Sequence, residues 1–328
     1  MRIHRAMLMA AGLGTRLQPI TLDFPKALVP LLGVPMAQFA VDALIRAGVT
    51  EIVANIHHHP KQAEAGLRSL DLAGPPQTRL IISDESSQLL GSGGGIRQAL
   101  PLFEGEAFFL VNADVLSDLS LKDLGEYHQM MHRKFGVLVT LAILPGRAGA
   151  YREIVSDPIT GLITRLGQVV TGKPYFMGAA VLEPEALTHL APGPSEFVPQ
   201  ILAPAVRAGR ACAYSANCLW KDVGTPELWF DAHMALLDGI ETGSLAEPLR
   251  IRLETLNHRI GERIWVDRSL PLVFDRSGWA GPCYFGAAAG VQELPREFGP
   301  RAFLYGCNAQ AHGPGIGAFG HWLPMSGV

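Results

Sequence analysis

The chain has 328 residues, which exceeds one typical domain and favours one large domain with a smaller one beside it. Hydrophobic residues make up 48% of the chain and charged residues only 17%, a composition that suits a compact soluble core. The formal net charge of -3 gives no basis for expecting nucleic acid or an anionic membrane as a partner. A phosphate-binding site therefore has to be a local feature.

The cysteines and the amino-terminal run point to a compartment. The four cysteines show neither CxxC pairing nor a histidine spacing typical of zinc, which indicates free thiols in a reducing cytoplasm. The apolar run at residues 6–11 resembles a short signal peptide, but it continues into Gly12-Leu-Gly rather than a cleavage site. A first buried strand entering a loop explains it better. Since no apolar run in the sequence approaches the length that spans a bilayer, we expect a soluble cytoplasmic protein.

Strand-like and helix-like segments alternate through the first two-thirds of the chain. In chain order, the pattern predicts a strand at 6–10, a helix at 36–47, a strand at 51–56, a helix at 61–70 and a strand at 79–83. A glycine run at 91–95 leads into a helix ending near residue 100, and strands follow at 107–111, 136–143 and 176–182. This order predicts an α/β fold, three-layered and Rossmann-like, with a mostly parallel sheet. Ligands in such folds bind beyond the carboxyl ends of the strands.

The amino-acid composition changes after about residue 237. Glycine, proline and aromatic residues become frequent there, and long amphipathic helices disappear. Gly281-Pro-Cys-Tyr-Phe285 recurs eighteen residues later as Gly299-Pro-Arg-Ala-Phe303. Eighteen residues is one coil of a left-handed β-helix, so the tail is either a short β-helix or an irregular β-rich extension. We predict one domain at residues 1–238 and a β-rich domain at 239–328.

The strongest local motif is Met9-Ala-Ala-Gly-Leu-Gly-Thr-Arg-Leu17, followed by Pro25-Lys26-Ala-Leu-Val-Pro30. It is neither a dinucleotide fingerprint nor a P-loop, because GxGxxG and GKS/T are both absent. Where the first strand ends, a glycine loop lets backbone N–H groups approach a phosphate chain. The guanidinium of Arg16 can grip phosphate oxygens, and Lys26 adds a point charge. We expect catalytic roles for these two residues and nucleotide contacts from Ala10, Ala11, Gly12, Gly14 and Thr15.

Two aspartates are candidate metal ligands. Asp114 follows an apolar strand, which puts its carboxylate at the carboxyl edge of the sheet, and Asp222 lies in an Asp-Val-Gly-Thr turn. Taken alone, each aspartate would more often be a helix cap or a turn residue. Mg²⁺ prefers hard oxygen ligands and is commonly held by one or two carboxylates together with substrate phosphates. Beside a phosphate loop, the pair therefore predicts a Mg²⁺ site.

These motifs together resemble the signature of the sugar-1-phosphate nucleotidylyltransferases, which include mannose-1-phosphate guanylyltransferases and glucose-1-phosphate thymidylyl- and uridylyltransferases. The resemblance extends over about residues 5–235. Phe108-Phe-Leu-Val-Asn-Ala-Asp114 is similar to the strand that ends in the metal-binding aspartate, and Trp220-Lys-Asp-Val-Gly-Thr-Pro-Glu227 to the motif with the second aspartate. The resemblance implies Mg²⁺-dependent transfer of a nucleotidyl group from a nucleoside triphosphate to a sugar 1-phosphate, with release of pyrophosphate.

Further site residues follow from the same resemblance. Ser83-Asp-Glu and Leu89-Leu-Gly-Ser-Gly-Gly-Gly-Ile96 are similar to a segment that contacts the base and the sugar, also in N-acetylmuramate-1-phosphate uridylyltransferases. This implies nucleotide contacts from Asp84, Glu85, Gly93 and Gly94, which would otherwise be loop charges and a flexible turn.

The sugar-phosphate side departs from the family pattern. Gly172-Lys-Pro174 lacks the glutamate that usually precedes the lysine, and Met177 stands where a small hydroxyl residue is common. Gly178, Lys173 and Glu153, with Arg152 beside it, are the candidates, although Lys173 fits an exposed turn equally well. His57-His58-His59 invites a metal interpretation, but consecutive residues after a strand point in different directions, so a structural or pocket-lining role is favoured.

Several functions stay open. GTP with mannose 1-phosphate is the favoured substrate pair, and UTP with an N-acetylated sugar 1-phosphate such as N-acetylmuramate 1-phosphate is the alternative; either product would feed cell-envelope polysaccharide synthesis. A catalytically silent regulatory subunit that binds an NDP-sugar belongs to another class, as does a β-helix acyltransferase using His312. The tail is also a candidate for homo-oligomer contacts.

Overall fold

The computed structural model describes residues 2–268, except 23, 76, 147–149 and 262–263, and four short strands farther along the chain. The chain divides into two compact units. The first consists of Met1–Leu13, Pro25–Ala27 and Ala37–Trp220, and the second of Gly14–Phe24, Leu28–Met36 and Lys221–Val328.

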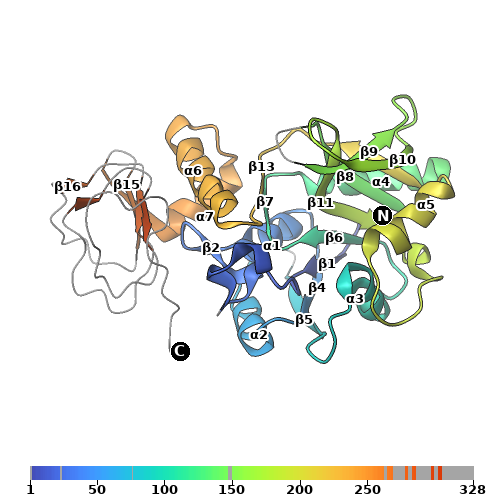
Figure 1. The fold of residues 1–328 in the computed structure, drawn as a ribbon, viewed down its shortest axis with the longest axis horizontal. Helices are drawn as coiled ribbons and strands as arrows, with labels where there is room; N and C mark the ends of the chain where they lie inside the picture. The colour runs from blue at the N-terminus through green and yellow to red at the C-terminus, as the bar shows by residue number, and fades with distance from the viewer. Residues whose placement is uncertain are drawn as a thin grey trace. The chain divides into compact units, whose positions relative to one another are not determined.

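A nine-stranded mixed sheet forms the centre of the first unit (Figure 1). Its core is parallel, with β1 (Arg5–Met9) between β4 (Glu51–Ile56) and β6 (Phe108–Asn112), and β5 (Arg79–Asp84) beyond β4. On the other side, β11 (Tyr175–Leu182) is antiparallel to β6 and to β8 (Val139–Leu144), which pairs in parallel with β12 (Ala211–Ser215). A hairpin of β9 (Tyr151–Ser156) and β10 (Ile163–Val170) completes the sheet, and β7 (Val115–Ser117) follows β6 in the chain. The α/β fold with a parallel sheet core is confirmed.

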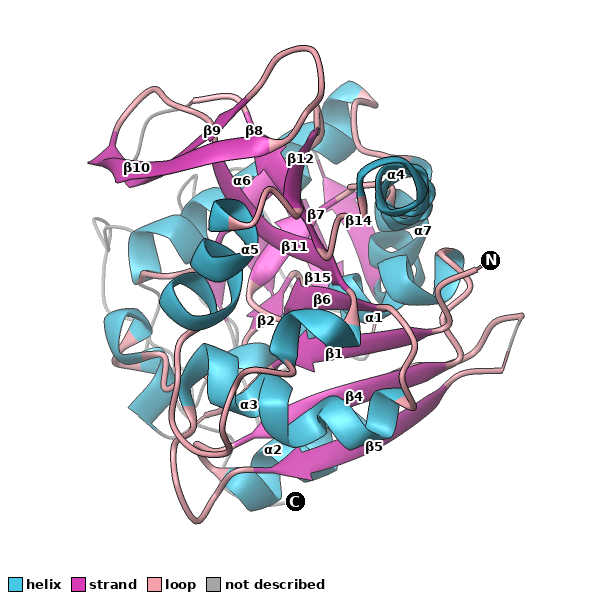
Figure 2. Ribbon diagram, turned by 90° about the vertical axis from the view of Figure 1, so that its right-hand side faces the viewer, coloured by secondary structure: helices cyan, strands magenta, loops and turns pink. Residues whose placement is uncertain are grey.

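Helices of the first unit pack on this sheet. They are α1 (Met36–Arg46), α2 (Pro60–Arg68), α3 (Gly91–Ala99), α4 (Leu121–Phe135) and α5 (Ala203–Arg207), with shorter turns at Leu100–Phe103, Pro184–Leu187 and Val198–Leu202. α3 packs on β1, β4 and β5, as Figure 2 shows, and α4 packs on β8, β11 and β12. Among the described helices, none has both the length and the apolar character that crossing a membrane requires.

Capping residues determine both ends of helix α4. Its first turn is capped by Ser120, whose hydroxyl accepts the N–H of Asp123, and it ends at Gly136, which has a φ of 65°. The sequence predicts a strand from residue 136, but β8 begins only at Val139. The reason is that Gly136 takes the left-handed conformation that terminates the preceding helix.

In the second unit, helices continue beyond the point where the sequence suggests that they stop. α6 (Pro226–Thr242) is capped by Thr225 and is followed by α7 (Glu247–Leu256), so helical structure continues past residue 237, where the sequence predicts only that long amphipathic helices end. The proposed domain boundary at residue 238 falls inside α6 and stays a prediction. The indole N–H of Trp229 donates to the carbonyl of Pro30 at 2.9 Å, which attaches α6 to the hairpin of β2 (Pro30–Leu31) and β3 (Val34–Pro35). This unit also contains η1 (Thr15–Leu17), η2 (Ile20–Leu22) and β14 (Asn257–Gly261), and β13 (Trp220–Asp222) begins at the last residue of the first unit.

Short parallel strands follow at a constant step. β15 (Ile264–Asp267) pairs in parallel with β17 (Cys283–Phe285), and β17 pairs in parallel with β19 (Ala302–Leu304). Ile264 lies opposite Cys283 and Cys283 opposite Ala302, a step of nineteen residues, and β16 (Gly278–Trp279) pairs with β18 (Glu297–Phe298) at the same step. A constant parallel step is what successive coils of a solenoid produce. It is one residue longer than the Gly-Pro echo suggests; both Gly-Pro pairs and His312 lie outside the described residues.

Candidate active site

An ion pair lies at the carboxyl end of β6. Asp114 follows this strand, and its carboxylate accepts a hydrogen bond from Nζ of Lys26 in the short turn Lys26–Leu28. The lysine side chain is only 10% exposed and the aspartate side chain 27%. Because a buried ammonium is costly without an opposite charge, Asp114 is the group that makes this position of Lys26 tolerable. The aspartate keeps enough exposure to accept a further ligand.

The start of the glycine loop is attached to two neighbouring strands. The N–H of Ala10, just after β1, donates to Oδ1 of Asn55 at 2.8 Å, and Nδ2 of Asn55 donates to Oε1 of Glu85 at 2.8 Å. Nδ1 of His57 contacts the carbonyl oxygen of Glu85 at 2.7 Å. Asn55 belongs to β4 and Glu85 follows β5, so one hydrogen-bonded chain joins three adjacent strand ends. These hydrogen bonds position the backbone where Ala10 and Ala11 enter the loop.

Glu85 is buried behind this loop. It is 2% exposed, burial raises the pKa of its carboxyl group, and its Oε2 has no hydrogen-bond partner among the described residues. Asp84, next to it, is exposed, and its carboxylate accepts the N–H of Ser86 at 2.7 Å. The contacts of Glu85 make it a residue that positions Ala10 through Asn55. Contact of Asp84 or Glu85 with a base or ribose stays a prediction.

Because Gly95 has no side chain, it leaves room for the hydrogen-bonded side chains of Glu85 and Asn55, and this predicts an effect on stability. A methyl group on its α-carbon would collide with Oε1 of Glu85 and lie 2.9 Å from Nδ2 of Asn55. Gly95→Ala should therefore lower the free energy of unfolding by about 1–3 kcal/mol, although alanine is the better helix former. Urea unfolding measures the loss. Gly12→Ala is the matched control, because nothing lies within 4 Å of the added methyl group; equal stability losses in the two variants would contradict the packing explanation.

The buried Glu85 also predicts a pH dependence. Because its pKa is raised in the folded state, the unfolded chain loses the proton first, at its ordinary value of 4.5. The carboxyl group therefore costs stability as the pH rises from that value through the folded-state pKa. Glu85→Gln should gain stability relative to the unmodified protein over this rise, measured by urea unfolding at pH values from about 4 to 8. A difference that does not change with pH would contradict it.

The glycine run packs against another loop of the same unit. The N–H groups of Gly93 and Gly94 both donate to the carbonyl of Ser195, at 2.8 and 3.1 Å. Methyl groups there would lie 2.9 Å from the backbone carbon of Glu196 and would collide with the carbonyl oxygen of Gly193. This close packing accounts for the glycines at the start of α3. Their contact with the nucleotide stays a prediction.

The second unit carries Arg16 and Asp222 on one small surface. Gly14 has a φ of 66°, and its carbonyl accepts from the hydroxyl of Thr21 at 2.7 Å. Arg16 is exposed and Asp222 half-buried. A methyl group on Gly224 would lie 3.0 Å from Nη2 of Arg16 and 3.2 Å from Oδ2 of Asp222, so both charged ends border the same α-carbon. Thr15 begins the turn that carries Arg16 and is exposed.

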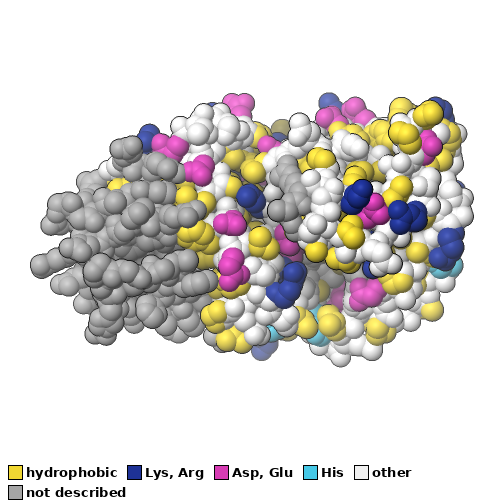
Figure 3. Space-filling model, turned by 45° about the horizontal axis from the view of Figure 1, so that its top comes forward, with side chains coloured by type: hydrophobic (Ala, Val, Ile, Leu, Met, Phe, Trp, Pro, Cys, Tyr) yellow, Lys and Arg dark blue, Asp and Glu magenta, His cyan; other side chains and the backbone are white. Residues whose placement is uncertain are grey.

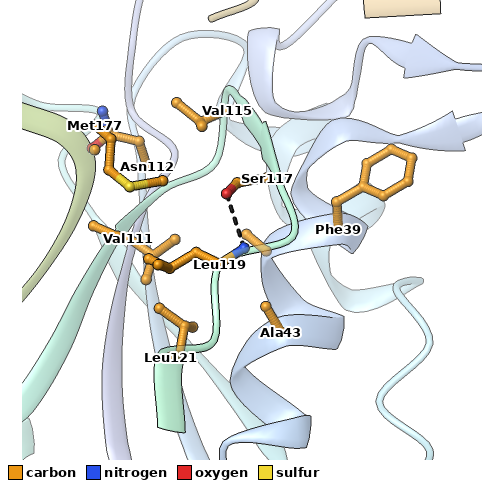
Figure 4. Close-up of a pocket in the computed structure, with 12 residues that line it drawn as sticks. Phe39, Ala43, Val111, Asn112, Val115, Ser117, Leu119, Leu121 and Met177 are labelled. Carbon is orange, nitrogen blue, oxygen red and sulfur yellow. Dashed lines mark hydrogen bonds between the residues drawn. The ribbon is translucent and has the colours of Figure 1, made fainter. Parts of the chain in front are cut away.

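The predicted sugar-side residues are spread along β9 to β11. Gly178 has a φ of 91°, a conformation that favours glycine, and packs against Asn112 at the end of β6. Beside it, the indole N–H of Trp220 donates to the carbonyl of Met177 at 2.8 Å. A small cavity of about 30 Å³ lies there. Figure 4 shows its lining, with Asn112 and Met177 on one side and Phe39 and Ala43 of α1 on the other.

The two charged sugar-side candidates differ in their surroundings. Glu153 is ion-paired with Arg165 at 3.1 Å, and Lys173 is exposed in the loop before β11. Figure 3 shows one face of the molecule, where Lys and Arg side chains alternate with Asp and Glu side chains over the described surface and do not gather into a single basic patch. The sugar-phosphate roles of Gly178, Lys173 and Glu153 stay predictions.

The structure thus groups the predicted residues into sets within each unit. Asp114 lies with Lys26, Ala10 and Glu85 are joined through Asn55, and Arg16 and Asp222 border Gly224. The resemblance already indicates a structural or pocket-lining role for Asn55 and His57, but neither the partners of Asn55 nor the loop at 193–196 follows from the sequence. An asparagine ending a strand beside the phosphate loop is a weak local signal for the first, and no local pattern marks the second.

Comparison with known proteins identifies the family. A model described as "Nucleotidyl transferase" matches residues 5–149. An N-acetylmuramate alpha-1-phosphate uridylyltransferase from Caulobacter vibrioides is 30% identical over 239 residues, which are 71% of this chain and 97% of that protein. The chain belongs to the sugar-1-phosphate nucleotidyltransferase family. Another relative in this family, the probable mannose-1-phosphate guanylyltransferase 2 of Oryza sativa subsp. japonica, is 27% identical over 263 residues, 78% of this chain and 70% of that protein.

Solved structures support the nucleotidyltransferase fold. HddC from Yersinia pseudotuberculosis superposes with a TM-score of 0.59 and 20% identity, over 71% of this chain and 99% of that one. A UDP-glucose pyrophosphorylase complexed with UDP-glucose gives a TM-score of 0.59 and 20% identity, over 72% of this chain and 99% of that one. At this level of identity the likeness concerns the fold alone.

Proposed function

We propose that this nucleotidyltransferase joins GTP to mannose 1-phosphate, giving GDP-mannose and pyrophosphate, with Mg²⁺ held by Asp114 and Asp222. The observation that carries the catalytic half is the Lys26–Asp114 pair at the carboxyl end of β6, where α/β sheets bind ligands. The substrate half is supported by relatives named as mannose-1-phosphate guanylyltransferases, one of which matches 78% of this chain.

The carboxylates of Asp114 and Asp222 are the type of ligand that a magnesium ion requires. Carboxylate oxygens are the hard ligands that Mg²⁺ prefers, and it commonly keeps one or two of them together with water and substrate phosphates. Asp114 already holds a cation, the ammonium of Lys26, and is partly exposed. When bound by the two aspartates, Mg²⁺ would supply positive charge beside the reacting phosphates.

The chemistry asks for little covalent help from the protein. An oxygen of the sugar phosphate attacks the α-phosphorus of the nucleotide in line, a new P–O bond forms, and the bond to the β-phosphate bridging oxygen breaks. The attacking monoester is already ionised at neutral pH, so no general base is required. The side chains accelerate the step by positioning the reactants and stabilising charge.

Each charged side chain then has a place in this step. The backbone N–H groups of the loop at residues 10–15 would hold the triphosphate. Arg16 would pair with the departing pyrophosphate through its planar guanidinium, and Lys26 would contact the α-phosphate after exchanging its partner Asp114 for substrate. Lys173 and Gly178 would border the sugar phosphate, with Glu153 near the sugar.

UTP with an N-acetylated sugar 1-phosphate is the second candidate. It is favoured by the Caulobacter relative, which is the more identical of the two at 30% against 27%. In both candidates the proposed roles of the aspartates, Arg16 and Lys26 are the same, because they act on phosphates. Only the base and sugar contacts would differ.

A substrate panel tests the proposal. The purified chain is incubated with each of the four common ribonucleoside triphosphates and dTTP against mannose, glucose and N-acetylmuramate 1-phosphates, and pyrophosphate release is measured with Mg²⁺ or with EDTA. We expect the highest kcat/KM for GTP with mannose 1-phosphate, and no release with EDTA. A highest value for UTP with N-acetylmuramate 1-phosphate would replace the substrate assignment. Absence of release with every pair would favour a regulatory NDP-sugar-binding subunit.

A further inference from the structure

A second group of metal-ligating side chains lies in the first unit, on helix α4 and after strand β11. His128 and His132 are four residues apart on α4 and so share one face of the helix. Glu183 directly follows Leu182, the last residue of β11. His128 is fully buried, whereas the side chains of His132 and Glu183 are 40% and 20% exposed. The cluster is thus anchored on one side and open on the other.

The spacing of the three side chains suits a small coordination sphere. Nε2 of His128 and Nδ1 of His132 lie 3.1 and 3.5 Å from the same oxygen, Oε1 of Glu183. One ligand atom from each residue lies within 4.8 Å of the others. In a tetrahedral zinc site with bonds of about 2.0–2.1 Å, neighbouring ligand atoms are roughly 3.3–3.4 Å apart. The two short separations bracket that value.

The surroundings of His128 support coordination through Nε2. Its Nδ1 contacts the hydroxyl of Thr140 at 2.7 Å, and this hydroxyl also contacts Sγ of Cys212 at 3.2 Å. A hydroxyl can accept as well as donate, so His128 can carry its proton on Nδ1 and present a lone pair at Nε2. Histidines that bind metals commonly donate from the other ring nitrogen to an oxygen in this way. His132 contacts the carbonyl of Val137 at 2.8 Å through Nδ1, and binding through that nitrogen would replace this contact.

We infer that His128, His132 and Glu183 bind a transition-metal ion, with Zn²⁺ as the best match and water as the fourth ligand. Two imidazoles and one carboxylate suit zinc, whereas Mg²⁺ prefers oxygen ligands and keeps its water. The same contacts without metal would be a hydrogen-bonded pair that satisfies a buried histidine. The two alternatives differ in whether an ion is held.

This site is distinct from the proposed magnesium site. Leu182, next to Glu183, pairs with Phe108 at the start of β6, whereas Asp114 follows the end of that strand. The two positions therefore lie at opposite ends of β6. An ion here would tie the last turns of α4 to the end of β11, so its effect is on stability rather than on nucleotidyl transfer.

Metal content and thermal unfolding of the full chain test the inference. The tag-free protein is stripped with chelator, equilibrated with a small molar excess of Zn²⁺ in a larger excess of Mg²⁺, freed of unbound metal by gel filtration, and assayed for bound zinc and for Tm with and without Zn²⁺. The variants His132→Gln and Glu183→Gln change the cluster. His189→Gln is the matched control, because this exposed histidine contacts only the carbonyl of Gln200 among the interactions described, at 2.7 Å, and lies outside the cluster.

We expect the unmodified protein and His189→Gln to hold one equivalent of zinc more than the two cluster variants. Zn²⁺ should raise Tm only in the proteins that hold it, and turnover with Mg²⁺ should be unchanged in His132→Gln. Equal zinc content and equal Tm shifts in all four proteins would overturn the inference and leave the cluster as a hydrogen-bonded network. Should Glu183→Gln fail to fold by circular dichroism, the half-exposed His132→Gln decides the outcome alone.

Discussion

Asp114→Asn is expected to lower turnover by roughly three powers of ten at saturating substrates. The substitution keeps the shape of the side chain but removes the charge proposed to hold Mg²⁺. Asparagine can still accept a hydrogen bond from Lys26, so the fold is retained, but the buried ammonium loses its counter-charge. We therefore also expect the free energy of unfolding to fall by about 1–3 kcal/mol.

Steady-state pyrophosphate release and urea unfolding measure the two effects of Asp114→Asn. Asp157→Asn is the matched control, because it makes the same chemical change in an exposed turn, where the carboxylate accepts the N–H groups of Ile159 and Thr160. Asp222→Asn should give a loss of similar size. A turnover near that of the unmodified protein in Asp114→Asn, at saturating Mg²⁺, would remove Asp114 from the metal site.

Lys26→Met is expected to lower turnover by roughly two to four powers of ten, because the proposed contact with the α-phosphate is lost. The same change frees the carboxylate of Asp114 from its ion pair. The Mg²⁺ concentration giving half-maximal rate should therefore fall while the maximal rate falls as well. If Lys26 had only a structural role, its loss would not lower the Mg²⁺ concentration that gives half-maximal rate.

Titrating the initial rate with Mg²⁺ measures both quantities, the maximal rate and the Mg²⁺ concentration that gives half of it. Lys122→Met is the control, since Lys122 is also paired with a carboxylate, Glu126 at 3.9 Å, but on the exposed face of α4. It should change neither quantity. An unchanged maximal rate in Lys26→Met would exclude the proposed phosphate contact, and an unchanged Mg²⁺ response would show that the lysine and the metal do not compete for Asp114.

The double variant Lys26→Met with Asp114→Asn separates stability from catalysis. Removing both charges leaves no uncompensated buried ion, so the stability losses of the single variants should not add. Turnover should stay as low as in the worse single variant, since neither proposed function is restored.

The sequence identified the elements whose signals are local. The apolar run of β1, the glycine loop after it and Asp114 at the end of β6 are each readable within about ten residues. The sequence predicts Asp222 in a turn, but it is the last residue of β13. The parallel core of the sheet also follows from the alternation of helices and strands. Boundaries set by a single backbone conformation are less accessible, as the late start of β8 after Gly136 shows.

The tertiary structure decided the contacts between distant segments. The pairing of Lys26 with Asp114, the burial of Glu85 against Asn55 and Gly95, and the packing of Gly93 and Gly94 on the loop at 193–196 all join residues 10 to about 100 positions apart.

The net charge of -3 gives no basis for expecting nucleic acid or an anionic membrane as a partner, and the glycine loop with Arg16 and Lys26 predicts a phosphate-bearing substrate, because backbone N–H groups and fixed cations suit phosphate. Only the folded chain shows that Asp114 meets Lys26 and that Glu183 meets His128 and His132. Sequence periodicity specifies which face of an element is buried, whereas the partner of a polar group depends on how distant elements pack. For that reason the glycine loop could be recognised in the sequence as a candidate phosphate site, whereas the histidine cluster could not be recognised there.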